Sequence, residues 1–249
     1  MTATGYPAHV TVPSPVRGVL LAGGTGSRLL PLTRVTNKHL LPVGEVPMIF
    51  HPLRALADAG VTEVLVVTGV EHMGDVVGTL GSGREFGVEL TWRVQDEAGG
   101  IAEALGLAEG FARGGPVVVV LGDNVFSAPL GPEIERFRAV GGARILLSEV
   151  DDPHRFGCPW FDGPTLLRID EKPAEPGSPY AVTGIYFYES DVFDVIRTLV
   201  PSERGELEIT DVNNHYLAQG RLGWGVLPGW WTDAGTHTSL ARANRLVRG

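Results

Sequence analysis

The fold is decided by the stretch Leu20-Leu21-Ala22-Gly23-Gly24-Thr25-Gly26-Ser27-Arg28-Leu29-Leu30-Pro31-Leu32-Thr33, followed shortly by Asn37-Lys38-His39-Leu40-Leu41-Pro42-Val43. An apolar strand over residues 18–22 leads into a glycine-rich turn and then to two cations, Arg28 and Lys38. The three glycines of the turn lack a Cβ, so backbone N–H groups there can approach an anion closely. Arg28 offers a planar fork to phosphate oxygens, and Lys38 adds a compact positive charge. The stretch therefore predicts a triphosphate-binding site at the carboxyl end of a first strand.

Two common phosphate-binding motifs do not occur in this sequence. A P-loop needs Gly, four residues, and then Gly-Lys followed by Ser or Thr, and no such run is found. In a dinucleotide-binding fingerprint a third glycine would stand at Leu29, and Pro31 follows soon after it. The glycines alone would also fit an ordinary turn between a strand and a loop. The two cations that follow them favour an anion-binding site.

The composition excludes several classes of protein. The net charge of −9 argues against a general nucleic-acid-binding surface, which needs a basic patch. A single cysteine, Cys158, excludes an internal disulfide and fits a cytoplasmic location. No apolar run approaches about 18 residues, so we expect no membrane-spanning helix. Residues 1–16 lack the basic start and apolar core of a secretory signal, and we expect them to form a flexible tail.

Strand patterns alternate with helix patterns along the chain. Strands are predicted over 18–22, 64–68, 88–94, 117–121, 143–150, 165–170, 180–188 and 222–227. Helices are predicted over 48–59, 71–80, 101–111, 191–199, 208–218 and 236–246, and the loop over 125–132 is assigned no function. This alternation predicts an α/β fold with a Rossmann-like, mainly parallel or mixed sheet covered by helices on both faces. Ligands of such sheets bind beyond the carboxyl ends of strands.

Candidate ligand-binding residues follow several of these strands. The amide of Gln95 can donate and accept, which suits the edge of a pyrimidine base, although a solvated loop fits the same residues. Asp123 can bind Mg²⁺ once a triphosphate supplies further oxygens, or it can simply form a turn. Glu171 beside Lys172 suits a substrate with hydroxyls and a phosphate, but a surface ion pair is the commoner meaning of such a pair.

Together these motifs resemble the sugar-1-phosphate nucleotidylyltransferases, and in particular their thymidylyltransferase branch. The matching segments are Ala22–Leu29, Lys38–Val43, Gly100–Ala104, Leu121–Asn124, Glu171–Pro173, Pro201–Asn213 and Trp230–Thr236. The resemblance covers about residues 17–245, with the motifs in the family's order. It implies the nucleotide-diphospho-sugar transferase fold as a single domain over residues 17–249. Residues 17–140 would form its nucleotide-binding half and residues 141–249 its sugar-phosphate-binding half.

The resemblance implies a Mg²⁺-dependent transfer from dTTP to glucose 1-phosphate that gives dTDP-glucose and pyrophosphate. It assigns catalysis to Arg28 and Lys38 and the metal to Asp123 and Asp233, each of which follows a predicted strand. The residues implied to bind the nucleotide are Leu21, Gly23, Gly24, Thr25, Gly26, Ser27, Gln95, Gly100 and Asp123. Those implied to bind the sugar phosphate are Gly157, Glu171, Lys172, Val182, Tyr186 and Arg204.

Three departures from the family pattern leave the substrate open. Glu103 and His39 each stand where the thymidylyltransferases have Gln, and Phe156-Gly157-Cys158 replaces Tyr-Gly-Val. The same chemistry with UTP, ATP or GTP, or with an amino-sugar or cyclitol phosphate, is therefore an alternative. A non-catalytic nucleotide-sugar sensor is disfavoured because the charged residues are all present, and a nicotinamide-dependent enzyme is disfavoured by Leu29. The resemblance also implies a homo-oligomer, a tetramer in the family, without nucleic-acid or membrane partners.

Overall fold

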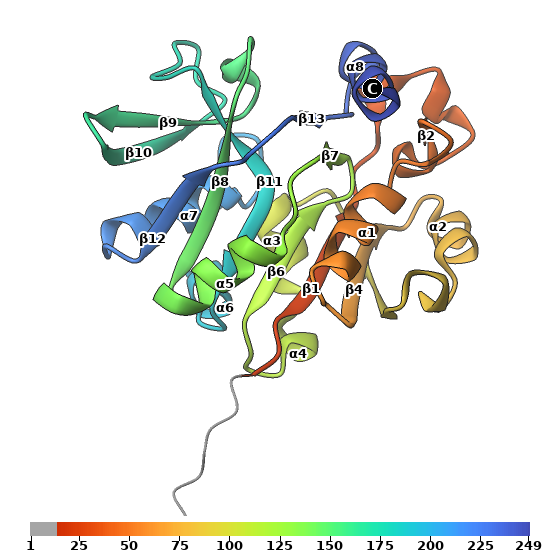
Figure 1. The fold of residues 1–249 in the computed structure, drawn as a ribbon, viewed down its shortest axis with the longest axis horizontal. Helices are drawn as coiled ribbons and strands as arrows, with labels where there is room; N and C mark the ends of the chain where they lie inside the picture. Colours follow the sequence, from red (N-terminus) through yellow and green to blue (C-terminus); the bar gives the residue numbers. More distant parts are fainter. Residues whose placement is uncertain (1–13) are drawn as a thin grey trace, which may run out of the picture.

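The computed structural model describes residues 14–249, and a seven-stranded sheet forms their centre (Figure 1). The strand order is β12-β8-β11-β6-β1-β4-β5. In that order the strands are Leu222–Val226, Ala143–Glu149, Tyr180–Tyr188, Val117–Leu121, Arg17–Ala22, Glu63–Gly69 and Glu89–Gln95. β11 runs antiparallel to both of its neighbours, and the other neighbouring pairs are parallel. The predicted mainly parallel, mixed sheet is confirmed.

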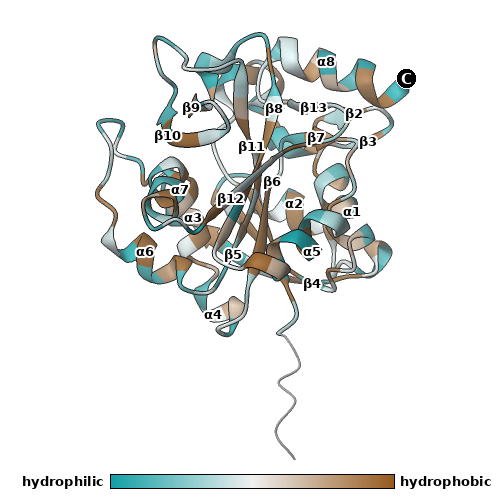
Figure 2. Ribbon diagram, turned by 60° about the vertical axis from the view of Figure 1, so that its left-hand side comes forward, coloured by the Kyte–Doolittle hydropathy of each residue, from teal (hydrophilic) through white to brown (hydrophobic). Residues whose placement is uncertain are grey.

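Helices cover both faces of this sheet, as Figure 2 shows from the side. One face carries α3 (Ile101–Gly106), α4 (Glu109–Ala112), α6 (Val192–Thr198) and α7 (Ile209–Ala218). The other carries α1 (Phe50–Asp58), α2 (Met73–Leu80) and α5 (Gly131–Val140). The central strands are unbroken apolar runs, such as Val64–Val67 and Val117–Val120, because both of their faces are buried. Each face therefore has its own hydrophobic core.

Shorter elements are added at the carboxyl edge of the sheet. Three two-stranded sheets pair β9 (Gly157–Asp162) with β10 (Thr165–Glu171), β13 (Trp231–Asp233) with β7 (Asn124–Phe126), and β2 (Pro42–Val43) with β3 (Val46–Pro47). Single 3₁₀ turns cover Ser27–Leu29, Leu32–Arg34, Lys38–Leu40, Arg84–Phe86 and Pro153–Arg155. The closing helix α8 (His237–Arg248) packs on a third small core that contains Leu29, Val43 and Ala243.

The structure differs from the sequence-based prediction in several segments. The helix predicted over 101–111 is two helices, α3 and α4, and α3 ends at Gly106, whose helix propensity is poor. The predicted loop over 125–132 contains most of β7 and the start of α5. β2, β3, β7, β9 and β13 were not predicted; β7 and β13 are short and are held by pairing with each other across more than one hundred residues, whereas β9 forms a hairpin with the predicted strand β10. Local patterning carries little signal for such strands.

The predicted tail falls mostly outside the structure. Its residues 1–13 lie outside the described residues, whereas Val16 is only 7% exposed and packs into the core beside α1, α2 and α5. The packed part of the chain therefore begins one residue before the predicted boundary. Within residues 14–249, none of the helices has the length and apolar character needed to cross a membrane.

Candidate functional site

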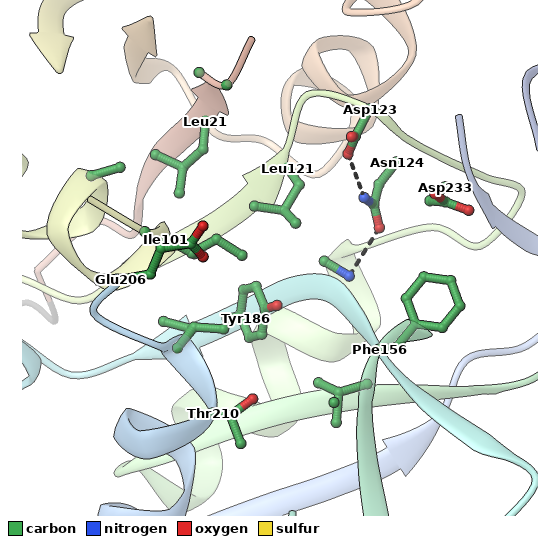
Figure 3. A pocket seen from close by; sticks show the side chains of 18 of the residues that line it. Leu21, Ile101, Leu121, Asp123, Asn124, Phe156, Tyr186, Glu206, Thr210 and Asp233 are labelled. Carbon is green, nitrogen blue, oxygen red and sulfur yellow. Dashed lines mark hydrogen bonds between the residues drawn. The ribbon is translucent and has the colours of Figure 1, made fainter. Parts of the chain in front are cut away.

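A cavity of about 330 Å³ opens at the carboxyl edge of the sheet, and most of the predicted site residues line it (Figure 3). Its lining contains Leu21, Gly23, Gly24, Arg28, Lys38, Gln95, Gly100, Asp123, Gly157, Glu171, Lys172, Val182, Tyr186 and Asp233. Four predicted residues are not part of the lining, namely Thr25, Gly26, Ser27 and Arg204. The structure therefore brings together residues from both halves of the chain.

The glycine turn begins where β1 ends at Ala22. Gly24 and Gly26 have φ values of +90° and +64°, which side chains with a Cβ rarely adopt. A Cβ on Gly26 would also lie 2.9 Å from a Thr33 methyl carbon, and Thr33 Oγ1 donates to the Gly26 carbonyl at 2.9 Å. Gly26 therefore shapes the turn, while Gly23 and Gly24 form the part of it that faces the cavity.

Lys38 forms a buried ion pair with Asp123. Lys38 Nζ lies 2.5 Å from Asp123 Oδ2, and both side chains are largely buried. Burial by itself would raise the pKa of Asp123, but the charges of Lys38 and His39 and the hydrogen bonds from Lys38 and Asn124 together outweigh it and hold that pKa well below its ordinary range. Burial, with a smaller contribution from Lys38, lowers the pKa of neighbouring His39 to about 3, so His39 is neutral. The site therefore presents an ionised carboxylate next to a lysine.

The second carboxylate, Asp233, lies close to Asp123, because both come within 3.5 Å of a Cβ placed on Gly235. It follows β12 in the chain, as predicted, and it is the last residue of β13, a short strand that was not predicted, where it lies opposite Asn124 of β7. Burial, and then the charge of Asp123, raise the pKa of Asp233, while Arg155 opposes this rise. Arg155 Nη2 donates to Asp233 Oδ2 at 2.9 Å. Each carboxylate thus has a cation as its partner.

Three charged groups converge on Gly235. A Cβ placed on Gly235 would lie 3.2 Å from both Arg28 Nη2 and Asp233 Oδ2, and 3.5 Å from Asp123 Oδ2. The two carboxylate oxygens therefore lie close together beside Gly235, and a pair of neighbouring carboxylates suits a hard divalent cation. In residues 14–249 no three or more His, Cys, Asp or Glu side chains cluster as a metal site. A cation held here would need further oxygens from a substrate, as a triphosphate provides.

Asn124 connects the two halves of the site and was not predicted. Its Oδ1 accepts from the Gly184 backbone N–H at 2.9 Å and from Trp231 Nε1 at 2.7 Å. Its Nδ2 donates to Asp123 Oδ1 at 3.0 Å, as Figure 3 shows. This side chain is only 2% exposed, so all three contacts are shielded from water. Sequence reasoning could have found Asn124 from its position, because it is an amide side chain directly after Asp123 at the end of a predicted strand.

Arg155 is the other functional candidate that sequence reasoning missed. Besides Asp233, it bonds Asp152 Oδ2 at 2.7 Å, and its guanidinium lies 5.0 Å from the ring centroid of Phe156. Phe156 in turn packs edge-on against Trp231, so the arginine is held by contacts on three sides. Arg155 directly precedes Phe156, where the sequence departs from the family pattern, so a cation at this place could be seen in the sequence. No local pattern predicted that this arginine would contact Asp233.

The nucleotide loop after β5 is tied to the sugar-phosphate half of the chain. Leu207 N–H donates to the Gly99 carbonyl at 2.7 Å, and Ala102 N–H donates to the Leu207 carbonyl at 3.2 Å. Gly100 has φ of +101°, and a Cβ there would lie 2.4 Å from the Leu207 carbonyl oxygen. Only glycine fits at position 100 without moving the two segments apart.

Glu171 is the centre of a polar network at the far end of the cavity. Its Oε2 accepts from Thr210 Oγ1 at 2.6 Å, and its Oε1 lies 3.2 Å from Lys172 Nζ and 3.4 Å from Arg204 Nη2. Arg204 therefore reaches this network although it does not line the cavity. Lys172 has φ of +46°, an uncommon conformation that carries its side chain to the cavity.

The wall between the two ends is formed by β11. Tyr186 faces the cavity, is only 4% exposed, and stacks on Tyr188 with ring centroids 6.1 Å apart. Burial raises the pKa of Tyr186 far above its ordinary value, so this phenol stays protonated and can donate a hydrogen bond. Val182 lies on the same strand. Gly157 lies next to Thr210, because a Cβ placed on Gly157 would be 3.2 Å from Thr210 Oγ1.

Known proteins resemble this chain over most of its length. The sequence profile of the nucleotidyl transferase family matches residues 17–248. The glucose-1-phosphate thymidylyltransferase of Actinoplanes sp. is 44% identical over 237 residues, which cover 94% of this chain and 78% of that relative. The enzyme of the same name from Mycobacterium tuberculosis is 40% identical and is matched over 82% of its length, again with 94% of this chain.

Solved structures show the same similarity. One from Bacillus anthracis, described as a candidate glucose-1-phosphate thymidylyltransferase in complex with sucrose, is 58% identical with a TM-score of 0.90. The match covers 94% of this chain and 95% of that chain. A UDP-glucose pyrophosphorylase complexed with UDP-glucose has a TM-score of 0.83 over 94% of this chain and 99% of that chain. At 21% identity it shows the fold alone.

Proposed function

The chain belongs to the nucleotidyl transferase family, and we propose that it transfers a thymidylyl group from dTTP to glucose 1-phosphate, giving dTDP-glucose and pyrophosphate. The enzyme class, a nucleotidyltransferase, follows from the family. Thymidylyltransferases from several bacteria match over 94% of this chain, which supports the thymidylyl donor and the glucose 1-phosphate acceptor. The observation that carries the proposal is that Arg28, Asp123 and Asp233 lie together around Gly235, in the cavity that the glycine turn also lines.

The transfer needs no nucleophile from the protein. A phosphate oxygen of glucose 1-phosphate attacks the α-phosphorus of dTTP and forms the new P–O bond, while the bond to the bridging oxygen breaks and pyrophosphate leaves. The attacking oxygen is already anionic, so the protein's contribution is to align the two phosphates and neutralise charge. Lys38 and Arg28 are the cations beside the glycine turn, and we assign them this role.

We further propose that Asp123 and Asp233 hold Mg²⁺ during the reaction. Two facing carboxylate oxygens without other protein ligands fit an ion that takes its remaining ligands from triphosphate oxygens and water. When bound, Mg²⁺ would neutralise charge on the triphosphate. Lys38 contacts Asp123 and Arg155 contacts Asp233, and these ion pairs hold both carboxylate side chains in place. The same arrangement would let the two cations turn toward substrate phosphates.

The sugar phosphate is assigned to the other end of the cavity. Glu171 can accept hydrogen bonds from sugar hydroxyls, and Thr210 orients its carboxylate. Lys172 and Arg204 supply positive charge next to Glu171, which suits the phosphate of the same substrate. The predicted homo-oligomer and the predicted cytoplasmic location stay predictions.

Pyrophosphate release tests the proposal. The purified protein would be assayed with Mg²⁺ and glucose 1-phosphate against dTTP, UTP, CTP, ATP and GTP, with a coupled enzyme that detects pyrophosphate. We expect release to be fastest with dTTP and next fastest with UTP. Release with ATP or GTP alone would refute thymidylyl transfer but keep the chemistry. If no pyrophosphate were released with any of the five nucleotides, and none with amino-sugar or cyclitol phosphates as acceptors, the result would favour a non-catalytic nucleotide-sugar sensor.

A further inference from the structure

We propose that Glu103 fixes the orientation of the Gln95 amide and thereby makes the site select pyrimidines that carry an N–H at ring position 3. This inference rests on the proposed function, because it concerns the base of the triphosphate. Glu103 is one of the residues that depart from the family pattern, and the proposed transfer chemistry does not use it.

The contacts of Gln95 carry the proposal. Gln95 is 7% exposed, and its Nε2 donates to Glu103 Oε2 at 2.6 Å and to the Gly100 carbonyl at 3.2 Å. A carboxylate and a backbone carbonyl can accept hydrogen bonds but cannot donate them. Both neighbours therefore require the NH₂ group on their side. The orientation of this amide therefore follows from the chemistry of its two partners, since both of them can only accept.

The oxygen of the same amide faces the nucleotide side. Gln95 Oε1 lies 3.1 Å from the position that a Cβ on Gly23 would occupy, and both residues line the cavity. A nucleotide whose phosphates lie on the glycine turn would place its base beside Gln95, since the opposite end holds Glu171 and Lys172. The base therefore meets the oxygen of the Gln95 amide, which can only accept. The NH₂ group of the same amide is already bonded to Glu103 and to the Gly100 carbonyl.

An acceptor at this place discriminates between pyrimidines. Thymine and uracil carry N3–H, which can donate to Gln95 Oε1, whereas N3 of cytosine is itself an acceptor. If the amide turned over to suit cytosine, its oxygen would face Glu103 and the Gly100 carbonyl, so an unfavourable pair of acceptors would remain. With ring position 3 at Gln95 Oε1, cytosine therefore loses a buried polar contact in either orientation of the amide.

The local backbone is built to admit this carboxylate. A Cβ on Gly99 would lie 2.1 Å from Glu103 Oε2, so the glycine makes room for the side chain that contacts Gln95. Gly99 is in turn held by the bond from Leu207 N–H to its carbonyl. A glutamine at position 103 could donate as well as accept, so it would tolerate both orientations of the Gln95 amide, and only the Gly100 carbonyl would still oppose the reversed one.

The test compares dUTP with dCTP, which differ only at ring positions 3 and 4. For the unchanged protein and for Glu103→Gln, kcat/KM would be measured for each nucleotide by pyrophosphate release. We expect Glu103→Gln to lower the dUTP-to-dCTP ratio about tenfold, since one buried acceptor clash is relieved. The kcat with dUTP should change little, because the orientation suited to N3–H stays available. A merely structural role would lower both activities together.

Two further variants complete the design. In a Gln95→Ala background, Glu103→Gln should leave the ratio unchanged, because Glu103 acts through Gln95. Glu97→Gln removes the same charge from an exposed position in the loop that leads into α3, and it serves as the matched control. A ratio that stays the same in Glu103→Gln, with normal activity on dUTP, would overturn the proposal and leave the transferase function standing.

Binding separates this inference from the proposed function. If no nucleotide releases pyrophosphate, the proposed function fails, and the Kd values of dUTP and dCTP would be measured by calorimetry instead. A preference for dUTP that falls about tenfold in Glu103→Gln would still support the role of Glu103. Equal Kd values for the two nucleotides in the unchanged protein would overturn it.

Discussion

Replacing Asn124 by alanine should destabilise the protein strongly, because one side chain satisfies three buried groups. The variant leaves the Gly184 N–H and the Trp231 Nε1–H without an acceptor and removes a donor from Asp123. Each unsatisfied buried donor costs about 1–3 kcal/mol, so the two N–H groups together cost roughly 2–6 kcal/mol. Water that enters from the adjacent cavity offsets part of this cost. We therefore expect a loss of about 3–4 kcal/mol in the free energy of unfolding.

Urea unfolding with linear extrapolation measures this loss. The matched control is Asn214→Ala, since Asn214 makes two bonds to the backbone of Ile169, at 2.8 and 3.0 Å, from a half-buried position. Water can replace those bonds, so the control should lose only about 1 kcal/mol. If Asn124→Ala lost no more than the control, the assignment of Asn124 as the connection between β7, β11 and β13 would be refuted.

Three other changes test the site. Lys38→Met should lower kcat/KM for dTTP by a factor equivalent to about 2.7–4 kcal/mol, judged from the loss of one charge-stabilising donor, and near-normal turnover would contradict its assignment. Gly100→Ala should force the loop away from Leu207 and lower kcat/KM at least about tenfold, whereas Gly110→Ala, where a Cβ meets nothing within 4 Å, should not. His39 has a pKa of about 3 instead of 6.5, so its neutral form stabilises the fold fully above pH 6.5 and this stability is lost as pH falls toward 3. Without Mg²⁺, the unfolding free energy of the unchanged protein should therefore fall about 2 kcal/mol more between pH 7 and pH 5 than that of His39→Gln, and parallel losses would refute this.

Most of the cavity could be predicted because its residues come from local motifs. Arg28 and Lys38 follow the glycine turn, Asp123 follows β6, and Glu171 ends β10, so each was recognisable from its neighbours in the chain. The structure places all four in the lining of one cavity. Their catalytic and binding roles stay predictions.

The parts that could not be predicted depend on pairing between distant segments. Asp233 follows β12 as expected, but its place next to Asp123 depends on β13, a short strand that pairs with β7 more than one hundred residues earlier in the chain. The split between α3 and α4 was also missed, since the apolar pattern over 101–111 continues across both helices.

The sequence by itself determined the alternation of strands and helices, the glycine turn and the identity of the charged residues. These follow from hydrophobic period, turn chemistry and side-chain charge, which are properties of neighbouring residues. Only the tertiary structure decided that Arg155 meets Asp233, 78 residues away, and that Asn124 joins Gly184 and Trp231, 60 and 107 residues away. Such contacts form because the packed sheet brings strand ends to one edge, and no local pattern records which side chains then face each other.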